Sequence, residues 1–300
     1  MTEAIKKSAI VAIVGRPNVG KSTLLNHILG QKISITSRKP QTTRHTLLGI
    51  HTEGDFQLVF VDTPGIHSEH KKALNEYMNH AATQAMADTD IICMIVDRTH
   101  WNADDERVFK YVKRHSAKLV LVVNKVDLLN DKGRLLPYLE ELYQKSGADE
   151  IVPVSAFTPS DVQRLVQTLV KLSPTGEAIF PEDQVTTRSS RFLASEIVRE
   201  KITRQLGDEL PYSATVAIES FDVGERFTEI HATIYVERQG QKKILIGDGG
   251  SRLKSIGTEA RLDMERLFDH KVVLKLWVKV KANWSDDARA MKSLGFGDAD

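Results

Sequence analysis

The sequence predicts an α/β protein in which a mostly parallel sheet, covered by helices on both faces, is followed by a smaller α+β unit. Three observations predict this fold class. Over the first 172 residues, short apolar runs alternate with amphipathic segments, a pattern typical of parallel strands joined by crossover helices. A glycine-rich loop separates the first apolar run from the first amphipathic segment. Beyond a polar, proline-marked stretch the pattern becomes helix, strand, strand, helix, helix, strand.

The strands of the first part are predicted from apolar runs that are too short for helices. They are Ile10–Val14, Phe56–Val61, Ile91–Val96, Leu119–Val123 and Ile151–Val154. The predicted helices are Ser22–Leu29, Leu74–Ala87, Asp105–Lys113, Leu135–Lys145 and Val162–Leu172. Nearly continuous apolar strands are typical of parallel sheets buried on both faces. The segment from Thr46 to Val61, with turn residues around Gly54, predicts a hairpin that adds one antiparallel edge strand.

The second part is predicted to begin after a stretch that stops the last helix. We expect a first domain over residues 1–173, a linker over 174–190 and a second domain over 191–300. Its predicted elements are a helix at Arg191–Leu206, strands at Thr215–Glu219 and His231–Glu237, two helices that meet near Gly247 and end at Leu267, and a strand at Val272–Val280. Trp277 lies on this last, alternating strand and is expected in the core.

Composition excludes several classes of protein. The chain has 300 residues, 41% hydrophobic and 27% charged, which is ordinary for two globular domains. Its apolar runs are far shorter than the roughly 20 residues of a membrane helix, and the polar start from Met1 to Ser8 does not resemble a signal peptide. We therefore expect a cytoplasmic protein. Cys93, the only cysteine, is expected to be buried. No heptad pattern indicates a dimer, so a monomer is expected.

The glycine-rich loop fits the pattern G-x-x-x-x-G-K-[ST], which predicts a phosphate site. Its residues, with the one that follows, are Gly15, Arg16, Pro17, Asn18, Val19, Gly20, Lys21, Ser22 and Thr23. In such a loop, backbone NH groups surround phosphate oxygens, Lys21 neutralises phosphate charge and Ser22 binds Mg²⁺. A side chain at Gly15 or Gly20 would prevent the close approach of the backbone to the phosphates.

A second motif follows the predicted strand that ends at Val61. It consists of Asp62, Thr63, Pro64 and Gly65. The Asp62 carboxylate can hold a magnesium-bound water, and the Gly65 NH can donate to a terminal phosphate oxygen. By itself this sequence is also an ordinary turn. Its place after the phosphate loop favours the functional interpretation.

A third motif predicts that the base of the nucleotide is guanine. Asn124, Lys125 and Asp127 follow a buried strand, at the edge of the sheet where ligands bind in open α/β folds. The two oxygens of Asp127 match the N1 and N2 donors of guanine, whereas adenine would leave this carboxylate unpaired at a cost of roughly 3 kcal/mol or more. After the next strand, a backbone NH at Ser155 or Ala156 can donate to guanine O6.

The polar segment from Ile33 to Arg44 is predicted to be a switch. A hydroxyl from this segment, preferably that of Thr43 rather than Thr42, would reach Mg²⁺ when a terminal phosphate is bound. The alternative is a plain solvated loop. We expect Arg44 to be solvated as well. Lys21, Thr43, Asp62 and Gly65 are thus the predicted catalytic residues.

Gly247 and Gly250 form a Gly-x-x-Gly turn between the two helices of the second part. Such a turn can hold about four nucleotides of single-stranded RNA backbone, but two glycines at this spacing are also common in plain helix–helix turns. Local charge favours RNA. From Arg238 to Lys281 there are eleven Lys or Arg against five Asp or Glu, a net charge of +6, although the whole chain is close to neutral at +1.

The order of these motifs resembles that of the translation-factor-like GTPases. Residues 15–22 together with Gln41, Thr42, Thr43 and Arg44 resemble the bacterial Era family, and so do residues 237–243 and 284–287. The resemblance implies a P-loop GTPase domain followed by a type II KH RNA-binding domain, with Mg²⁺ as cofactor and a potassium ion held by Asn18. It also implies binding to the 3′ end of 16S ribosomal RNA during assembly of the 30S subunit, and peripheral association with the inner membrane.

By this resemblance, the RNA site lies around the glycine turn. The implied RNA-binding residues are Lys242, Lys243, Ile244, Ile246, Gly247, Asp248, Gly249, Gly250, Arg252 and Lys254. One departure from the Ras-like pattern concerns hydrolysis. Ile66 stands where Ras-like enzymes place a glutamine that orients the attacking water. An isoleucine cannot form that hydrogen bond, so slow intrinsic turnover is expected.

Three functions stay open at this point. The first is a GTPase switch that holds RNA in one nucleotide state. The second is a constitutive RNA-binding module with a structural nucleotide, which would bind RNA equally with GTP or GDP. The third is a GTPase that senses membrane or cell-cycle state and whose second domain binds protein. Loss of RNA binding on changing Gly247 and Gly250 to Asp would separate the first two from the third.

Overall fold

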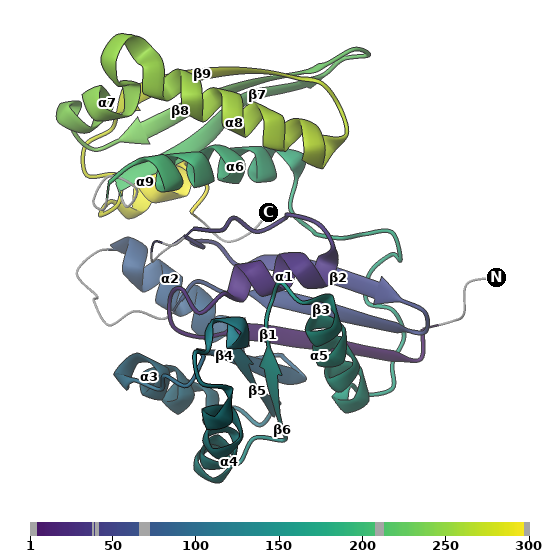
Figure 1. Ribbon diagram of the computed structural model, residues 1–300. Coiled ribbons are helices and arrows are strands. Elements are labelled where there is room, and N and C mark those ends of the chain that lie inside the picture. Colours follow the sequence, from purple (N-terminus) through teal and green to yellow (C-terminus); the bar gives the residue numbers. More distant parts are fainter. Residues whose placement is uncertain (1–4, 38, 40–41, 66–72, 208–212, 297–300) are drawn as a thin grey trace. The chain divides into compact units, whose positions relative to one another are not determined.

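The computed structural model describes residues 5–37, 39, 42–65, 73–207 and 213–296 (Figure 1). Contacts divide these residues into two compact units, which are described separately. The described residues of the first unit lie within 5–34, 43–65 and 77–187, and those of the second within 35–42, 73–76 and 188–296. The domain and linker boundaries expected from the sequence stay a prediction.

The first unit contains a six-stranded sheet in the order β2-β3-β1-β4-β5-β6. The strands are β1 (Lys7–Val14), β2 (Leu47–Glu53), β3 (Phe56–Asp62), β4 (Ile91–Asp97), β5 (Lys118–Asn124) and β6 (Glu150–Val154). All neighbouring pairs are parallel except β2 and β3. The predicted parallel sheet with one antiparallel edge strand is confirmed.

Helices cover both faces of this sheet. They are α1 (Lys21–Leu29), α2 (Ala73–Gln84), α3 (Ala103–Val112), α4 (Leu135–Ser146) and α5 (Pro159–Leu172). One core cluster joins alternate residues of β1, β4 and β5 to α3 and α4. Helices α1 and α5 pack together, α1 against β2 and β3 and α5 against β1. Every residue of β4 is buried, which explains why its sequence is continuously apolar. Cys93 lies within β4 as a buried free thiol, as expected.

The outer edge of β2 is covered by the chain that follows α5. The backbone NH of Ile50 donates to Val185 O at 2.8 Å, and Gly49 pairs with Thr186. Further along, the Gln57 side chain hydrogen-bonds the backbone of Ile179 and Phe180. The contacts of Gly49 and Ile50 satisfy backbone groups that an edge strand would otherwise expose, and those of Gln57 hold the same stretch of chain beside β3.

The second unit contains a three-stranded sheet in the order β7-β8-β9. Its elements are α6 (Ser190–Gln205), β7 (Ala214–Val223), β8 (Thr228–Val236), α7 (Gln239–Ile246), α8 (Ser251–Phe268), β9 (Val272–Val280) and α9 (Ala288–Ser293). Strands β7 and β8 are antiparallel, and β8 and β9 are parallel. The predicted order from α6 to β9 is confirmed, whereas α9 was not predicted.

Two tryptophans in this unit have opposite environments. The indole of Trp284 is fully buried, and its Nε1 donates to Ser213 O at 3.0 Å. Trp277 is 44% exposed, so its predicted place in the core is wrong. The even-numbered Val272 and Val278 of β9 are buried instead. Alternation predicts a strand with one buried face, but does not say which residues form that face.

Candidate nucleotide and RNA sites

The phosphate loop connects β1 to α1, as predicted. At Gly15 the backbone φ is +153°, and a Cβ atom there would lie 2.6 Å from Ile95 O. At Gly20 φ is +101°, and a Cβ would lie 2.4 Å from Asn124 Nδ2. Both glycines are therefore required by contacts within the protein as well as by the approach of a phosphate.

The side chain of Lys21 is buried at the centre of this loop. Its Nζ donates to Gly15 O at 3.0 Å and to Arg16 O at 3.1 Å. Burial lowers the pKa of Lys21 to about 8, although the Asp62 carboxylate acts in the opposite direction. A phosphate oxygen would offer the ammonium group a charged acceptor in place of these carbonyls.

Side chains from three segments meet beside Lys21 and form what we call the oxygen cluster: Ser22, Ser34, Thr43 and Asp62. Ser22 Oγ lies 2.9 Å from Thr43 Oγ1 and donates to Asp62 Oδ2 at 2.9 Å. Ser34 Oγ donates to the same carboxylate oxygen at 2.8 Å. Ser34 was not predicted, because a lone serine in a polar segment gives no sequence signal.

The oxygen cluster fits a magnesium ion. Its donors are a carboxylate and hydroxyls, the hard oxygen ligands that Mg²⁺ prefers. Asp62 is fully buried, and its Oδ1 has no hydrogen-bond partner. Burial raises the pKa of Asp62, while Lys21 and two serine hydroxyls act in the opposite direction. A cation would satisfy the unpaired oxygen and stabilise the charged carboxylate.

The neighbouring turn contacts the phosphate loop. Thr63 is buried and its Oγ1 donates to Ile13 O at 2.8 Å. A Cβ on Gly65 would lie 3.1 Å from the backbone nitrogen of Pro17. Ile66 lies outside the described residues.

The predicted guanine site lies at the end of β5. Asn124 is buried, and its Nδ2 donates to Val19 O at 2.8 Å. Lys125 Nζ donates to Asn18 O at 2.7 Å, so this motif contacts the phosphate loop at two points. The Asp127 side chain is exposed. Its two oxygens are thus accessible for a base.

The segment after β6 is organised by a single carboxylate. Asp161 Oδ2 accepts the NH of Ser155 at 2.9 Å, and Ala156 is buried. Ser155 Oγ is also buried and has no hydrogen-bond partner. Phe157 is exposed beside the ring of His27, with their centroids 5.2 Å apart.

Two buried carboxylates that the sequence analysis missed hold the motifs in place. Asp105 Oδ2 accepts from Arg16 Nε at 3.0 Å and from the NH of Asn102 at 3.1 Å. Asp97 Oδ2 accepts from Lys125 Nζ at 2.9 Å. The role of Asp105 could have been predicted from the Asn-x-x-Asp capping pattern at the start of α3. Asp97 follows an apolar run, and its sequence context gives no signal for a partner in another motif.

Arg44 was expected to be solvated, but its side chain is buried, with 1% of its surface exposed, so this prediction is wrong. The residues expected to form a mobile polar segment are thus partly internal, and Ile33, Ser34 and Ile35 are buried as well. Gln41, one of the family-like residues, lies outside the described residues.

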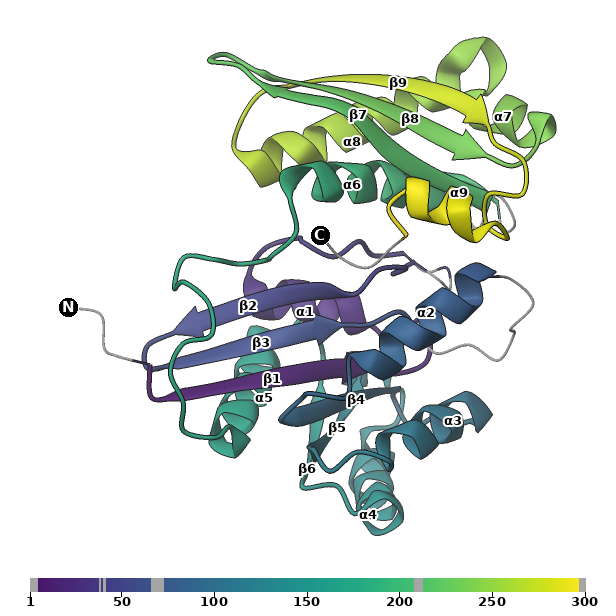
Figure 2. The same ribbon diagram turned by 180° about the vertical axis from the view of Figure 1, so that it is seen from behind.

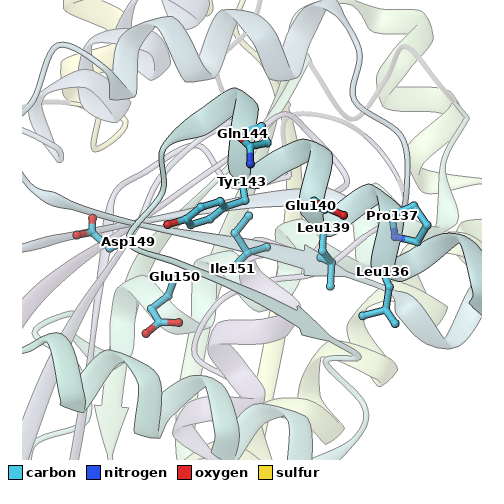
Figure 3. Close-up of a pocket in the computed structure, with 9 residues that line it drawn as sticks. All are labelled: Leu136, Pro137, Leu139, Glu140, Tyr143, Gln144, Asp149, Glu150 and Ile151. Atoms are coloured by element: carbon cyan, nitrogen blue, oxygen red, sulfur yellow. The ribbon is translucent and has the colours of Figure 1, made fainter.

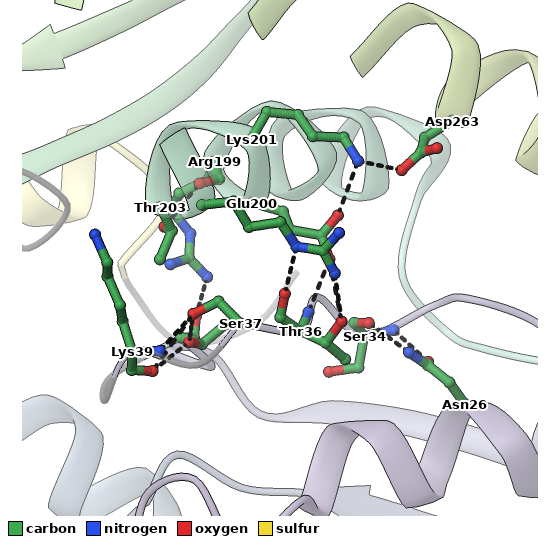
Figure 4. A network of polar contacts seen from close by, with 12 residues as sticks. Asn26, Ser34, Thr36, Ser37, Lys39, Arg199, Glu200, Lys201, Thr203 and Asp263 are labelled. Atoms are coloured by element: carbon green, nitrogen blue, oxygen red, sulfur yellow. Dashed lines mark hydrogen bonds and ion pairs between the residues drawn. The ribbon is translucent and has the colours of Figure 1, made fainter. Parts of the chain in front are cut away.

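The segment Ile35–Thr42, which we call the docked segment, belongs by its contacts to the second unit (Figure 4). Its Thr36 donates to Glu200 Oε1 from N at 3.0 Å and from Oγ1 at 3.3 Å. Arg204 donates to Thr36 O at 3.0 Å. Lys39 reaches the carbonyl of Leu206 at the end of α6. Glu200 is fully buried and is also paired with Lys201, which contacts Asp263 of α8.

The glycine turn, Gly247 to Gly250, joins α7 to α8. Backbone φ is +72° at Gly247, +57° at Gly249 and +81° at Gly250, values that favour glycine at all three positions. A Cβ at Gly247 would lie 2.8 Å from Arg252 Cβ. Arg252 Nη1 donates to Ile244 O at 2.6 Å and so closes the turn.

The side chains predicted around this turn differ in exposure. Ile244 is half exposed, whereas Ile246 packs against the core of the unit. Lys254 and Arg252 are exposed on the first turn of α8, Lys243 is exposed on α7, and Lys242 is half-buried there. Backbone NH groups and cationic side chains thus lie at one end of the unit, as phosphate binding requires.

A groove of about 680 Å³ lies elsewhere, between α4 and β6. Figure 3 shows that its walls combine the apolar Leu136 and Tyr143 with the carboxylates Glu140, Asp149 and Glu150. None of the predicted site residues lines it. Among the described residues there is no cluster of three His, Cys, Asp or Glu that could hold a metal, and no helix long and apolar enough to cross a membrane.

Comparison with known families gives two matches. Residues 10–125 match the model of the family described as 50S ribosome-binding GTPase. Residues 209–285 match the model of the KH domain. The two matches correspond to the nucleotide motifs and to most of the second unit.

Curated relatives match over almost the whole chain. GTPase Era of Pseudomonas aeruginosa is 59% identical over 288 residues, which cover 96% of this chain and 94% of the relative. GTPase Era of Ectopseudomonas mendocina is 56% identical over 299 residues, 99% of this chain and 100% of the relative.

Two solved structures are similar throughout. One is a variant of Aquifex aeolicus Era bound to GDP and aluminium fluoride, with a TM-score of 0.93. The other is Era in complex with MgGDPNP and nucleotides 1506–1542 of 16S ribosomal RNA, with a TM-score of 0.94. Each is 38% identical to this chain, and each match covers 97% of this chain and 99% of the other.

Proposed function

The chain belongs to the Era family of GTPases, and from that premise we propose that it is a GTP-hydrolysing switch that binds the 3′ end of 16S ribosomal RNA through its KH domain and assists assembly of the 30S subunit. One observation supports the nucleotide part above all others. The phosphate loop, the oxygen cluster and the guanine motif are already connected by hydrogen bonds between Ser22 and Asp62 and between Asn124 and Val19. A preorganised site of this kind needs little rearrangement to accept GTP.

Different residues of the first unit would bind the base, the phosphates and Mg²⁺. Asp127 would accept from guanine N1 and N2, and Asn124 would hold the loop against the base. Lys21 would neutralise charge on the terminal phosphates. Ser22, Thr43 and Asp62 would hold Mg²⁺, which when bound neutralises phosphate charge during transfer.

Hydrolysis is proposed to be slow without a partner or a monovalent cation, because Ile66 cannot orient water by a side-chain hydrogen bond. Asn18 supports a role for potassium. It is exposed in the loop with φ +65°, and its amide oxygen is a neutral donor suited to a monovalent ion. Fast GTP hydrolysis by the purified protein in a buffer with sodium as the only monovalent cation would contradict this part of the proposal.

In the second unit, the glycine turn would bind RNA backbone. Its NH groups at the start of α8 favour an anion, and the lysines on α7 and α8 add positive charge. The docked segment supports coupling between nucleotide and RNA. It is bordered in the chain by Ser34 and Thr43, which belong to the oxygen cluster, and its own contacts are with α6. A change at the metal site would thereby alter the partners of a helix in the RNA-binding unit.

The experiment is to measure affinity for a short RNA from the 3′ end of 16S ribosomal RNA, at fixed salt, with a non-hydrolysable GTP analogue and with GDP. A preference of tenfold corresponds to about 1.4 kcal/mol of coupling. We expect unequal affinities. Equal affinities would favour the constitutive RNA-binding module, and no binding in either state would remove the RNA function.

Variants locate the RNA site. The double change Gly247→Asp and Gly250→Asp adds negative charge at the turn and should abolish RNA binding while leaving GTP binding unchanged. The matched control is Gly240→Asp, which adds the same charge at an exposed position where a side chain meets no neighbour. From the sequence patterns described above we also propose a cytoplasmic monomer, and from the family resemblance alone a peripheral association with the inner membrane.

A further inference from the structure

Strand β9 presents two different faces. Val272 and Val278 point into the core, and the odd-numbered residues Lys275, Trp277 and Lys279 are exposed on the opposite side. Helices α6 and α8 pack on the core side of the β7-β8-β9 sheet, as Figure 2 shows, where the strands lie in front of α8. We call the opposite side the outer face.

Aromatic rings from neighbouring strands meet on the outer face. Thr233 of β8 pairs in register with Trp277, and it lies between His231 and Tyr235, whose side chains share its face. The ring of His231 lies against Trp277, with centroids 5.3 Å apart and planes inclined at 60°. Thr233 is nearly fully buried, whereas Trp277 beside it is 44% exposed. An indole in this setting offers a π-face to a ligand.

Lysines surround these rings. Lys275 Nζ lies 2.5 Å from Glu229 Oε1, and the Nζ of Lys281 lies 5.9 Å from the centre of the Tyr235 ring. Lys279 lies in register with Tyr235. Three carboxylates share this face: Glu219 and Glu229 are hydrogen-bonded to Tyr235 and to His231, and Asp222 lies in register with Glu229. Three lysines and three carboxylates leave the face close to neutral, so stacking of bases on the rings, rather than net charge, would hold RNA here.

The position of β9 connects the outer face to the glycine turn. It is an edge strand of the sheet, and α7, which leads into the turn, packs against it. An RNA strand that leaves the turn along this edge can therefore continue onto the outer face without crossing another strand. Exposed aromatic rings are the usual platforms on which successive bases of single-stranded RNA stack.

We propose that the outer face, centred on Trp277 with His231, Tyr235, Lys275 and Lys279, is a second binding surface that stacks bases of single-stranded RNA beyond the glycine turn. The proposal extends the RNA-binding function proposed above. In this proposal the glycine turn binds about four nucleotides, and the nucleotides that follow them along the RNA bind to the outer face.

The test compares two RNAs from the 3′ end of 16S ribosomal RNA. One has about 5 nucleotides, enough for the glycine turn alone, and the other about 16. Trp277→Ala should weaken binding of the longer RNA by about tenfold and leave the shorter one unchanged. Trp277→Phe, which keeps a ring, should bind both as the unchanged protein does. Phe227→Ala is the matched control, because it removes another exposed aromatic ring, at the turn between β7 and β8.

Fluorescence of the unchanged protein gives a readout that does not depend on folding of a variant. The longer RNA should quench the tryptophan emission more than the shorter RNA does, and the difference would report Trp277. Trp284 is buried, and the half-buried Trp101 of the first unit contributes equally with both RNAs. Unchanged affinity of Trp277→Ala for the longer RNA would overturn the proposal, and so would absence of quenching. Failure of the unchanged protein to bind the shorter RNA would instead contradict the glycine-turn function, and the longer RNA would still test the outer face.

Discussion

At the scale of single residues, the nucleotide site is determined by how closely its loops approach one another. Gly20 and Asn124 belong to motifs that are separated by about a hundred residues, yet no Cβ fits between them. The phosphate loop and the guanine motif are therefore in direct contact at Gly20 and Asn124. Changes there should affect both stability and binding.

Gly20→Ala should destabilise the protein by about 1–3 kcal/mol, through strain at a positive φ and the clash with Asn124. It should also weaken GTP binding at least tenfold. The matched control is Gly30→Ala, which has φ +65° but no atom near the new Cβ. It should cost about 1 kcal/mol and leave GTP affinity unchanged. Chemical denaturation and nucleotide titration measure both effects, and equal affinities of the two variants would contradict the argument.

Burial of Cys93 predicts a pH dependence of stability. Burial raises the pKa of its thiol from 9.0 to about 12. The folded protein therefore keeps the thiol neutral, while the unfolded chain ionises above pH 9. This contribution to stability is fully present below pH 9 and is lost between pH 9 and pH 12, at up to about 1.4 kcal/mol per pH unit.

The measurement is the free energy of unfolding from pH 8 to pH 11 for the unchanged protein and for Cys93→Ala. Other groups titrate in this range, but they are common to both proteins, so only the difference in slope is interpreted. A smaller alkaline loss is expected for Cys93→Ala, and thiol reagents should not label the folded protein at pH 8. Identical slopes would show that the thiol does not contribute.

At the scale of elements, α3 links helix capping to the phosphate loop. The Asn102 side chain accepts the NH groups of Asp104 and Asp105, and the Asp105 side chain accepts the NH of Asn102. The same Asp105 carboxylate holds Arg16. Burial raises the pKa of Asp105, and its hydrogen bonds with Asn102 and Arg16 act in the opposite direction.

Two variants of this cap separate its roles. Asn102→Ala should cost about 1 kcal/mol of stability and leave GTP affinity unchanged, because it removes only cap hydrogen bonds. Asp105→Ala should cost more and also weaken GTP binding several-fold, because Arg16 loses its partner. A double-mutant cycle between Asp105 and Arg16 measures their coupling. Equal effects of the two single changes on GTP affinity would contradict the link.

The elements were largely predictable from the sequence because burial on both faces makes strands continuously apolar. β4 and β5 were found in this way within one residue of their observed bounds. The nucleotide motifs were found because their spacing is local. The features that could not be predicted depend on contacts between distant segments of the chain. Asp97 and Asp105 have partners in other motifs, and the burial of Arg44 is set by residues that are distant in the sequence. The exposure of Trp277 depends on which face of β9 the helices cover.

At the scale of the whole molecule, the proposed switch requires that a change at the metal site alter the RNA affinity of the second unit. The docked segment is the part of the chain suited to this role. It has hydrogen bonds to three residues of α6, Arg199, Glu200 and Arg204, and its flanking residues are in the oxygen cluster. Coupling should thus depend on α6 side chains that contact neither nucleotide nor RNA.

Arg204→Ala removes the donor to Thr36 and should bring RNA affinities with the GTP analogue and with GDP closer together, with GTP affinity itself unchanged. The matched control is Arg191→Ala, on the same helix, whose guanidinium donates instead to Ile218 O and Glu219 O. It should leave the ratio of RNA affinities as it is. If Arg204→Ala also leaves the ratio as it is, the docked segment does not transmit the state of the nucleotide.

The docked segment also bears on whether the RNA-binding half can be exchanged between genes. Glu200 is fully buried, and two of its donors come from Thr36, which precedes it in the chain by 164 positions. A gene fusion that transferred only residues 188–296 to another protein would leave this carboxylate without those donors. A transfer by recombination would therefore preserve the unit best if residues 35–42 moved together with residues 188–296.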